Sequence, residues 1–158
     1  SFHDAEIAFV DYLIGQIYEM LPRGTALIVT SDHGMVDVGD SIIRINDSIM
    51  QRTDTISGEA RFLWFHPARG NHDSLLQDLQ DLYSNCAWVR SKDQVLDEGW
   101  FGRHISNQAK ERLGEIALLA RDPIAFVDKE NLGPRLVGRH GSLTEAEVYV
   151  PLITSFKD

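Results

Sequence analysis

Residues 26–36 read ALIVTSDHGMV, and this stretch decides how the rest of the chain is interpreted. The apolar run 26–30 predicts a buried strand that is apolar on both faces, as in the centre of a covered parallel sheet. Asp32 and His33 follow at the carboxyl end of the strand, where open α/β sheets bind their ligands. A carboxylate and an imidazole are metal ligands of two types on one rigid support. Gly34 lets backbone or a ligand approach closely.

A second histidine flanked by glycines occurs far downstream, His140 in the sequence GRHGS. A histidine between Arg and Gly is typical of a loop. An Asp-His-Gly sequence by itself is also compatible with a simple turn that leaves His33 exposed. The two motifs together indicate a metal-dependent hydrolase, and they indicate that this chain carries only part of the site.

The composition is that of a globular domain and argues against some classes of function. The chain has 158 residues, 43% of them hydrophobic, which is enough to bury a core in one domain. The net charge of −9 argues against a general nucleic-acid-binding surface. A small phosphorylated ligand is still compatible, because a bound metal reverses the local field. No apolar stretch reaches the ~20 residues that span a bilayer. The single cysteine, Cys86, is expected to be a buried structural thiol.

Hydrophobic periodicity predicts a mixture of helices and strands. A helix over 4–21, with Asp4 as its N-cap, precedes a strand over 25–30. Further along, we expect a helix over 72–83 and, after a strand, a short helix capped by Ser91. The remaining expected elements are strands over 41–45, 60–65, 86–89, 115–120, 124–127 and 148–153, a helical turn over 107–112 and a loop over 129–138.

This order of elements predicts an α/β fold with an inserted or appended α+β region. Helices and strands alternate at the start and again around 72–89, whereas the middle and the end carry several strands with little helix between them. Three approximate sub-regions follow: a core helix, strand and metal loop over 1–50, an α+β region over 51–128, and a histidine loop with a closing strand over 129–158.

The sequence around the Asp-His turn resembles the signature of the type I phosphodiesterase/nucleotide pyrophosphatase family of the alkaline phosphatase superfamily. The similarity continues in the same order over nearly the whole chain. It includes Asp11, LPRGT at 21–25, TSDHGM at 30–35, GEAR at 58–61, GWFG at 99–102, GRHGSLT at 138–144 and VPL at 150–152. The resemblance implies part of an alkaline-phosphatase-like sheet flanked by helices. It also implies that the chain is a single C-terminal fragment of a larger catalytic domain.

The resemblance implies the chemistry as well. In this family two zinc ions are bridged by the reacting phosphate. Asp32 and His33 would bind the zinc ion that also holds the nucleophile, and His140 would bind the other. One ion activates the attacking oxygen, and the second stabilises the leaving oxygen. The nucleophile is a Thr or Ser that forms a covalent phospho-enzyme intermediate.

The family also places the nucleophile, another aspartate and an Asp-x-x-x-His pair upstream of the Asp-His turn, and this chain does not contain that pattern. A catalytic zinc site needs about three protein ligands per ion. We therefore expect the isolated chain to be inactive as a phosphodiesterase and to hold zinc weakly or not at all.

The implied substrate is a small phosphodiester or nucleotide, bound by the intact enzyme. One alternative is a phosphomonoesterase, phosphonate hydrolase or sulfatase-like enzyme of the same superfamily, and another is a non-catalytic binding domain that retains the fold. The sequence around the nucleophile would distinguish the phosphodiesterase from the other enzymes of the superfamily. The zinc content of the intact protein would distinguish an enzyme from a non-catalytic binding domain. Because a sheet without its N-terminal strands exposes its edges, we also expect the chain to self-associate.

Other polar residues are expected to be structural. Glu145 and Glu147 are predicted to form the polar face of a short turn, and His66 is predicted to be an exposed loop residue. Asp37 and Asp40 are interpreted as solvated acids of a loop. The three tryptophans are expected to be packing groups.

Overall fold

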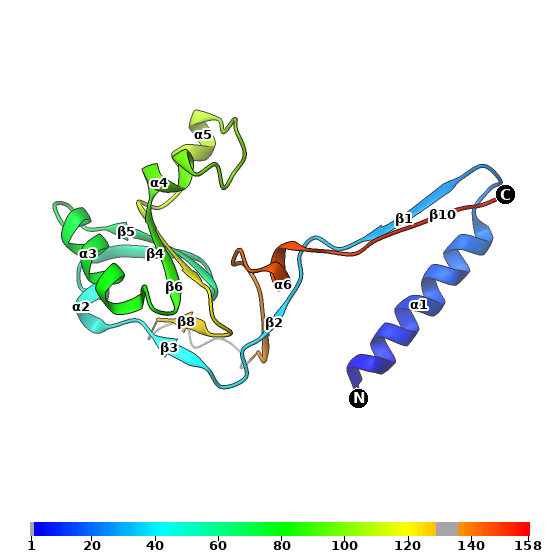
Figure 1. Ribbon diagram of the computed structural model, residues 1–158, viewed down its shortest axis with the longest axis horizontal. Coiled ribbons are helices and arrows are strands. Elements are labelled where there is room, and N and C mark those ends of the chain that lie inside the picture. The colour runs from blue at the N-terminus through cyan, green and yellow to red at the C-terminus, as the bar shows by residue number, and fades with distance from the viewer. Residues whose placement is uncertain (1, 129–135) are drawn as a thin grey trace. The chain divides into compact units, whose positions relative to one another are not determined.

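The computed structural model describes residues 2–128 and 136–158, and the chain divides into two compact units (Figure 1). The first unit comprises Ser1–Asp32 and Val150–Asp158, and the second comprises His33–Tyr149. The division falls inside the Asp-His motif, so the two neighbouring residues of that motif belong to different units.

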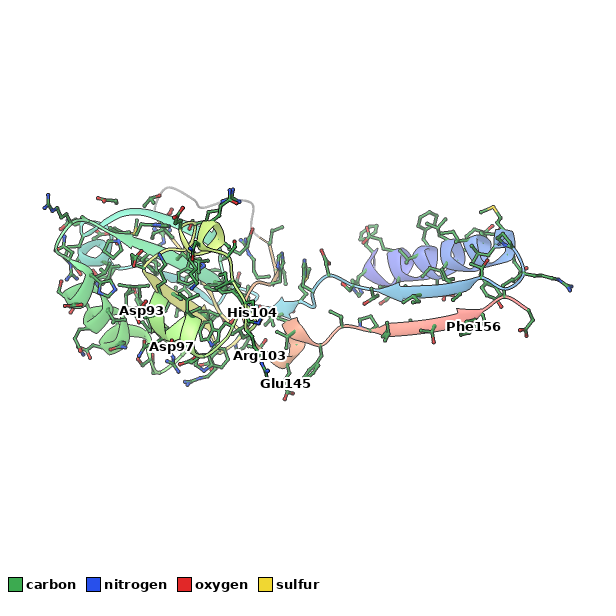
Figure 2. The ribbon with its side chains drawn as sticks, turned by 90° about the horizontal axis from the view of Figure 1, so that it is seen from above. Asp93, Asp97, Arg103, His104, Glu145 and Phe156 are labelled. Atoms are coloured by element: carbon green, nitrogen blue, oxygen red, sulfur yellow. The ribbon has the colours of Figure 1, made fainter. Side chains whose placement is uncertain are left out.

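The first unit consists of helix α1 (Phe2–Met20) and two strands, β1 (Ala26–Thr30) and β10 (Leu152–Phe156). The strands pair antiparallel along their whole length. Figure 2 shows both strands extended beside α1, with Phe156 labelled on β10. The Tyr18 hydroxyl on α1 donates to the Phe156 carbonyl oxygen at 2.7 Å, which ties the helix to the strands.

The strand β1 forms where the sequence predicts one, but the prediction of its surroundings is wrong. Among the described strands it pairs only with β10, and this pairing is antiparallel rather than part of a parallel sheet. Leu27 and Val29 are half-buried, whereas Ile28 is 61% exposed. A strand that is apolar on both faces needs a covering layer on each of them. This unit has one helix and one partner strand, so β1 is not buried.

The predicted helix is present as α1, but it runs over Phe2–Met20 rather than 4–21. It begins at Phe2, so Asp4 lies in the first turn and is not the N-cap. An acidic side chain in the first turn still complements the helix dipole. None of the described residues of α1 is buried. No helix in the described part of the chain, α1 included, is both long and apolar enough to cross a membrane.

The second unit is built on a four-stranded antiparallel sheet in the order β4-β5-β7-β6. The strands are β4 (Thr53–Glu59), β5 (Phe62–Pro67), β6 (Ala87–Ser91) and β7 (Ile116–Ala120). Every residue of β7 is buried, because the strand has a neighbour on each edge and is covered on both faces. Residues 60–61, predicted to begin a strand, instead form the turn between β4 and β5.

One face of this sheet packs against helix α3 (His72–Tyr83), which has the bounds that its hydrophobic period predicts. Leu75 and Leu79 of α3 are fully buried in one cluster with Phe65 of β5 and Leu118 of β7. Side chains alternate between the faces of a strand, so every second residue of β5 and β7 contributes to this cluster.

The opposite face carries a smaller cluster that includes Trp64, Leu119 and Val95 of helix α4 (Lys92–Asp97). The other two tryptophans pack against it, which confirms the prediction that the tryptophans are packing groups. Figure 2 labels Asp93 and Asp97, which lie in the first and last turns of α4. The sheet therefore has apolar packing on both of its faces.

The predicted cap of α4 is also confirmed. The Ser91 hydroxyl accepts from the Gln94 N–H at 3.2 Å, and the Gln94 side chain accepts from the Ser91 N–H at 2.8 Å. These reciprocal bonds form a capping box. The predicted helical turn near 107–112 is present as α5 (Asn107–Lys110).

Several short elements complete the second unit. Strand β2 (Val36–Asp37) pairs antiparallel with β9 (Gly138–Arg139), and β3 (Ile42–Arg44) pairs parallel with β8 (Ala125–Val127). The sequence predicts β3 and β8 but not β2 and β9, because a strand of two residues is too short to show a period. Helix α2 (Asp47–Met50) was missed for the same reason.

The end of the chain differs from the prediction of one closing strand over 148–153. Helix α6 (Glu145–Val148) occupies the start of this range, and β10 begins only after Pro151. A proline has no N–H to donate to a strand partner, so the start of β10 at the next residue is physically reasonable. Within the predicted loop over 129–138, residues 129–135 lie outside the described residues.

Candidate functional site

His33 and His140 lie together in the second unit. Their imidazole rings stack with centroids 3.7 Å apart and 12° between the ring planes. Both residues are half-buried. The pairing of β2 with β9 brings them together, because Val36 lies opposite Arg139, the residue before His140.

The orientation of the His33 ring is fixed by its own turn. Its Nδ1 lies 2.8 Å from the Gly34 carbonyl oxygen. Because a carbonyl oxygen can only accept, Nδ1 is the donor, and the neutral ring then carries its lone pair on Nε2. That nitrogen is the one suited to bind a metal ion.

Asp32, the third predicted ligand, is exposed and is the last residue of the first unit. The site geometry is therefore limited to His33 and His140, which lie in one unit. Asp37 and Asp40 are exposed, as predicted. The Asp37 side chain accepts from the Gly39 N–H at 2.9 Å, which shapes the turn after β2.

Gly34 is the residue at which the His33 turn meets the end of the second unit. Its N–H donates to the Glu147 carbonyl oxygen at 2.8 Å. A Cβ at position 34 would lie 2.0 Å from the Ala146 carbonyl oxygen. The close approach that the sequence predicts for Gly34 is thus confirmed, and the group that approaches is the backbone of α6.

A buried ion pair in the same unit joins the turn between β4 and β5 to helix α6. Arg61, in the turn between β4 and β5, contacts Glu147 of α6, and the two side chains are 0% and 1% exposed. Arg61 Nε and Nη2 donate to the two carboxylate oxygens of Glu147 at 2.7 and 2.8 Å. Nη1 donates to the carbonyl oxygens of Asp122 at 2.9 Å and Ile124 at 2.6 Å. With a longer bond from Nη2 to the Ala120 carbonyl, the guanidinium group has an acceptor for all five of its N–H donors.

The Glu147 carboxylate is also bonded to the loop that follows His140. Oε1 accepts from the Ser142 N–H at 2.9 Å, and Oε2 accepts from the Thr144 hydroxyl. The Ser142 hydroxyl donates to the Ala120 carbonyl oxygen at 2.6 Å. The His140 loop is thus hydrogen-bonded both to α6 and to the central strand β7.

These contacts set the ionisation of Glu147. Burial by itself would raise the pKa of the carboxyl, but the hydrogen bonds from Arg61, Thr144 and Ser142 and the positive charge of Arg61 outweigh it. The net effect is a pKa below the ordinary value of a glutamate. Glu147 is therefore an anion at neutral pH, and its contact with Arg61 is a charged, bidentate pair.

Two sequence predictions for polar residues are corrected here. Glu145 is exposed (Figure 2), but Glu147 is not part of the polar face of a turn, because it pairs with Arg61 in the interior. His66 is not an exposed loop residue, because it lies on β5, is half-buried, and has Nε2 3.2 Å from the Ser57 hydroxyl of β4.

The sequence contains one local signal for the start of α6. Thr144 and Glu147 have the T-x-x-E spacing that marks a helix start, and α6 does begin after Thr144. The burial of Glu147 has no local signal, since its partner Arg61 is distant in the sequence. Arg61 belongs to the GEAR motif at 58–61 that carries the family resemblance.

Cys86 packs against the core, which agrees with a structural thiol, although it is not fully buried as predicted. It is half-buried beside the cluster under α3, and its Sγ lies 3.6 Å from the Tyr83 carbonyl oxygen. Burial, with a smaller contribution from Asp122, raises the pKa of the thiol. A thiol with a raised pKa is a poor nucleophile at neutral pH.

The two histidines fit part of a zinc site. Imidazole nitrogen is a good zinc ligand, but a protein zinc site has four ligands in total. Among residues 2–128 and 136–158, no group of three or more His, Cys, Asp and Glu side chains is placed to hold a metal ion. The weak zinc binding expected for the isolated chain stays a prediction.

A cavity in the same unit reaches the residue before His140. Its volume is about 340 Å³, which is within the range of small-molecule sites. Charged side chains in its lining are those of Glu59, Asp128 and Arg139, and Leu63 and Phe126 contribute apolar surface. The cavity therefore offers both signs of charge and an apolar wall to a small ligand.

A family model described as type I phosphodiesterase / nucleotide pyrophosphatase matches residues 3–143. This chain belongs to that family. The match includes both histidines of the candidate site, and it confirms the resemblance that the motifs carry. No curated protein sequence matches the chain at a significant level.

Solved structures similar to this chain include two of ectonucleotide pyrophosphatase/phosphodiesterase 5. The murine protein has a TM-score of 0.73 and 22% identity over 94% of this chain and 39% of its own. The human protein has a TM-score of 0.75 and 20% identity over 98% of this chain and 41% of its own. This chain therefore spans about two fifths of the length of these structures.

A phosphonoacetate hydrolase from Sinorhizobium meliloti 1021, solved in complex with phosphonoformate, is also similar. Its TM-score is 0.61 with 18% identity, over 83% of this chain and 36% of its own. At such identities the likeness shows the fold. It confirms the predicted α/β class in which helices flank a sheet.

Proposed function

We propose that this chain is part of a zinc-dependent hydrolase that cleaves phosphodiester or pyrophosphate bonds in small, nucleotide-type substrates. The observation that carries the proposal is the stacking of His33 on His140 in a chain of the type I phosphodiesterase/nucleotide pyrophosphatase family. An inactive variant of the murine ectonucleotide pyrophosphatase/phosphodiesterase 5 was solved in complex with AMP. That complex supports a nucleotide as the substrate class.

In this proposal Asp32 and His33 bind one zinc ion, and His140 binds the second. Zinc ions in such a pair activate an oxygen nucleophile and neutralise charge on the reacting phosphate. His33 presents Nε2 because its Nδ1 donates to the Gly34 carbonyl oxygen. Asp32 contributes an anionic oxygen. The Thr or Ser nucleophile and the remaining ligands are proposed to lie outside this chain.

The second candidate is a phosphonate hydrolase of the same superfamily. It is favoured by the similarity to the phosphonoacetate hydrolase, which shares the fold. The two candidates use the same histidines and differ in the bond that is broken, P–O or P–C. A direct comparison of substrates on the intact protein separates them.

The test is the turnover of a nitrophenyl phosphodiester and of phosphonoacetate by the zinc-loaded intact protein. Loss of a metal ligand removes several kcal/mol of transition-state stabilisation, so His33→Ala and His140→Ala should each lower kcat/KM for the diester by about 100-fold or more. His104→Ala is the matched control, because His104 is exposed in the segment before α5 (Figure 2). Near-wild-type turnover by His140→Ala would contradict the proposal. Preferential turnover of phosphonoacetate would favour the second candidate.

Self-association is proposed for the isolated chain. The strands β1 and β10 contain no charged residue, and each pairs with only one neighbour among the described strands. Uncharged edge strands readily pair with another copy. Sedimentation velocity over a wide concentration range should show a rising apparent mass. A strictly monomeric profile would contradict this proposal.

A further inference from the structure

Glu147 connects the two segments that carry the histidines. Its backbone carbonyl oxygen accepts from the Gly34 N–H at 2.8 Å, directly beside His33. Its side-chain Oε1 accepts from the Ser142 N–H at 2.9 Å, in the loop that follows His140. One residue of α6 thus holds the His33 turn through its main chain and the His140 loop through its side chain.

The strand pairing between these segments is short, and beside it the Val38 N–H donates to the Val137 carbonyl oxygen at 2.9 Å. In the pairing of β2 with β9, Val36 lies opposite Arg139 and Asp37 lies opposite Gly138. A two-stranded ladder is marginal by itself, and one this short is weaker still. The histidine rings are only half-buried, so surrounding side chains do not enclose them. A contact that joins both segments would therefore add to the support of the rings.

Arg61 fixes the position of Glu147. It binds the carboxylate through two parallel N–H donors at 2.7 and 2.8 Å. Its third nitrogen donates to the carbonyl oxygens of Asp122 and Ile124, in the segment that links β7 to β8. The guanidinium group therefore connects the Glu147 carboxylate to the backbone of the segment between β7 and β8.

A buried ion pair at this position favours a role in orienting the carboxylate. Desolvation offsets much of the attraction in such a pair, so an apolar pair of similar size would fill the space with comparable stability. A bidentate Arg–Glu contact instead imposes direction, because the planar fork accepts one orientation of the carboxylate. In this orientation the Glu147 carboxylate also accepts hydrogen bonds from the Ser142 N–H and the Thr144 hydroxyl.

We propose that Glu147, oriented by Arg61, is a positioning residue that keeps His33 and His140 stacked for metal binding. The inference rests on the proposed function of the two histidines. Glu147 acts through the Gly34 peptide and the Ser142 N–H, and it does not act directly on a metal ion or a substrate.

The first test uses NMR on the metal-free chain. Glu147→Gln preserves the size of the side chain but replaces one acceptor oxygen by an NH₂ donor, which then faces other donors. Leu79→Ala is the control, because Leu79 of α3 is fully buried against the sheet, and its truncation should destabilise the unit without involving α6. Nuclear Overhauser effects between the rings of His33 and His140 should persist in the control and disappear in Glu147→Gln. Their persistence in folded Glu147→Gln would overturn the proposal.

A milder variant serves if Glu147→Gln does not fold. Thr144→Val removes one hydrogen bond to Glu147 and leaves the pair with Arg61 intact. The effects between the histidine rings should weaken in Thr144→Val relative to wild type. Intensities equal to those of the wild type would overturn the positioning role.

The second test measures zinc affinity of the intact protein by calorimetry. Loss of a residue that orients metal ligands costs about 10-fold to 100-fold in metal affinity, so Glu147→Gln should weaken zinc binding by about 10-fold or more. Leu79→Ala should bind zinc as the wild type does. Equal affinity in Glu147→Gln and wild type would overturn the positioning role. If the wild type binds no zinc, the proposed function fails, whereas the ring-to-ring effects still decide the role of Glu147.

Discussion

The two units contain strands of similar apolar composition, but only one unit buries them. In the second unit β7 reads IALLA, and all of its residues are buried. In the first unit β1 reads ALIVT, and its residues alternate between exposed and half-buried. The strand β7 has neighbours on both edges, whereas β1 pairs with β10 alone among the described strands. An apolar strand therefore does not determine its own burial, which depends on the layers placed around it.

Ion pairs show the same contrast. Lys157 and Glu19 of the first unit are in contact at 2.7 Å, but Glu19 is 72% exposed. Such a surface pair contributes little to stability. Arg61 and Glu147 are fully enclosed, and each satisfies several partners besides the other. The Lys157–Glu19 pair therefore solvates the surface, whereas the Arg61–Glu147 pair fixes geometry in the interior.

The largest decrease in the free energy of unfolding should come from truncating an aromatic side chain in the second unit. Phe65 is 0% exposed in the cluster under α3, so Phe65→Ala should lower the free energy of unfolding by about 3–5 kcal/mol. Phe156 on β10 is 69% exposed, so Phe156→Ala should change it by less than about 0.5 kcal/mol. Urea unfolding followed by circular dichroism and tryptophan fluorescence measures both. Equal losses would remove the distinction between the units.

Substitution of one glycine in each unit should give effects of opposite sign. Gly34→Ala places a Cβ 2.0 Å from the Ala146 carbonyl oxygen, so the backbone must move, and we expect a loss of about 1–3 kcal/mol. Gly15 lies inside α1 with nothing within 4 Å of its added Cβ. Gly15→Ala should therefore stabilise the helix by about 0.5–1 kcal/mol.

Hydrogen exchange of α1 and urea unfolding of the second unit measure these two effects separately. Protection in α1 should increase in Gly15→Ala, and the unfolding midpoint should fall in Gly34→Ala. A Gly34→Ala variant with unchanged midpoint would mean that the His33 turn does not press against α6.

The smallest effect should be the pH dependence contributed by Glu147. Its pKa is lower in the folded state than in the unfolded chain. Its contribution to stability is therefore fully present above the ordinary pKa of a glutamate, and it is lost as the pH falls through the lowered value. Glu147→Gln should abolish this part of the acid destabilisation. Glu19→Gln, on the surface of the first unit, should leave the pH profile of the wild type unchanged. Identical profiles for all three proteins would contradict this assignment.

Local signals in the sequence predicted the elements that depend on neighbouring residues. The helix over 72–83 and the Ser91 cap were correct, because a hydrophobic period and a capping box each lie within a few turns of chain. Strands β2 and β9 were not predicted, because two residues are too few to show a period, and helix α6 was predicted only as a short turn, although its Thr144–Glu147 start signal is local. The covered parallel surroundings of β1 were predicted from its composition, and composition does not specify which strands become neighbours.

The candidate site was predictable in part. The motifs predicted His33 and His140 as candidate metal ligands. The stacking of their rings agrees with a place in one site. The burial of Glu147 was not predictable, because an acidic residue in a turn is usually exposed. Its burial requires Arg61, and no local pattern relates these two residues.

The zinc content of the intact protein tests the account most directly, by elemental analysis after purification in zinc and removal of loosely bound metal. The account predicts two zinc ions per molecule of the intact protein in the wild type and in His104→Ala. It predicts fewer in His33→Ala and in His140→Ala, since each variant removes a ligand from a different ion. Zinc content that is unchanged in both histidine variants would contradict the claim that these stacked histidines form part of a two-zinc site.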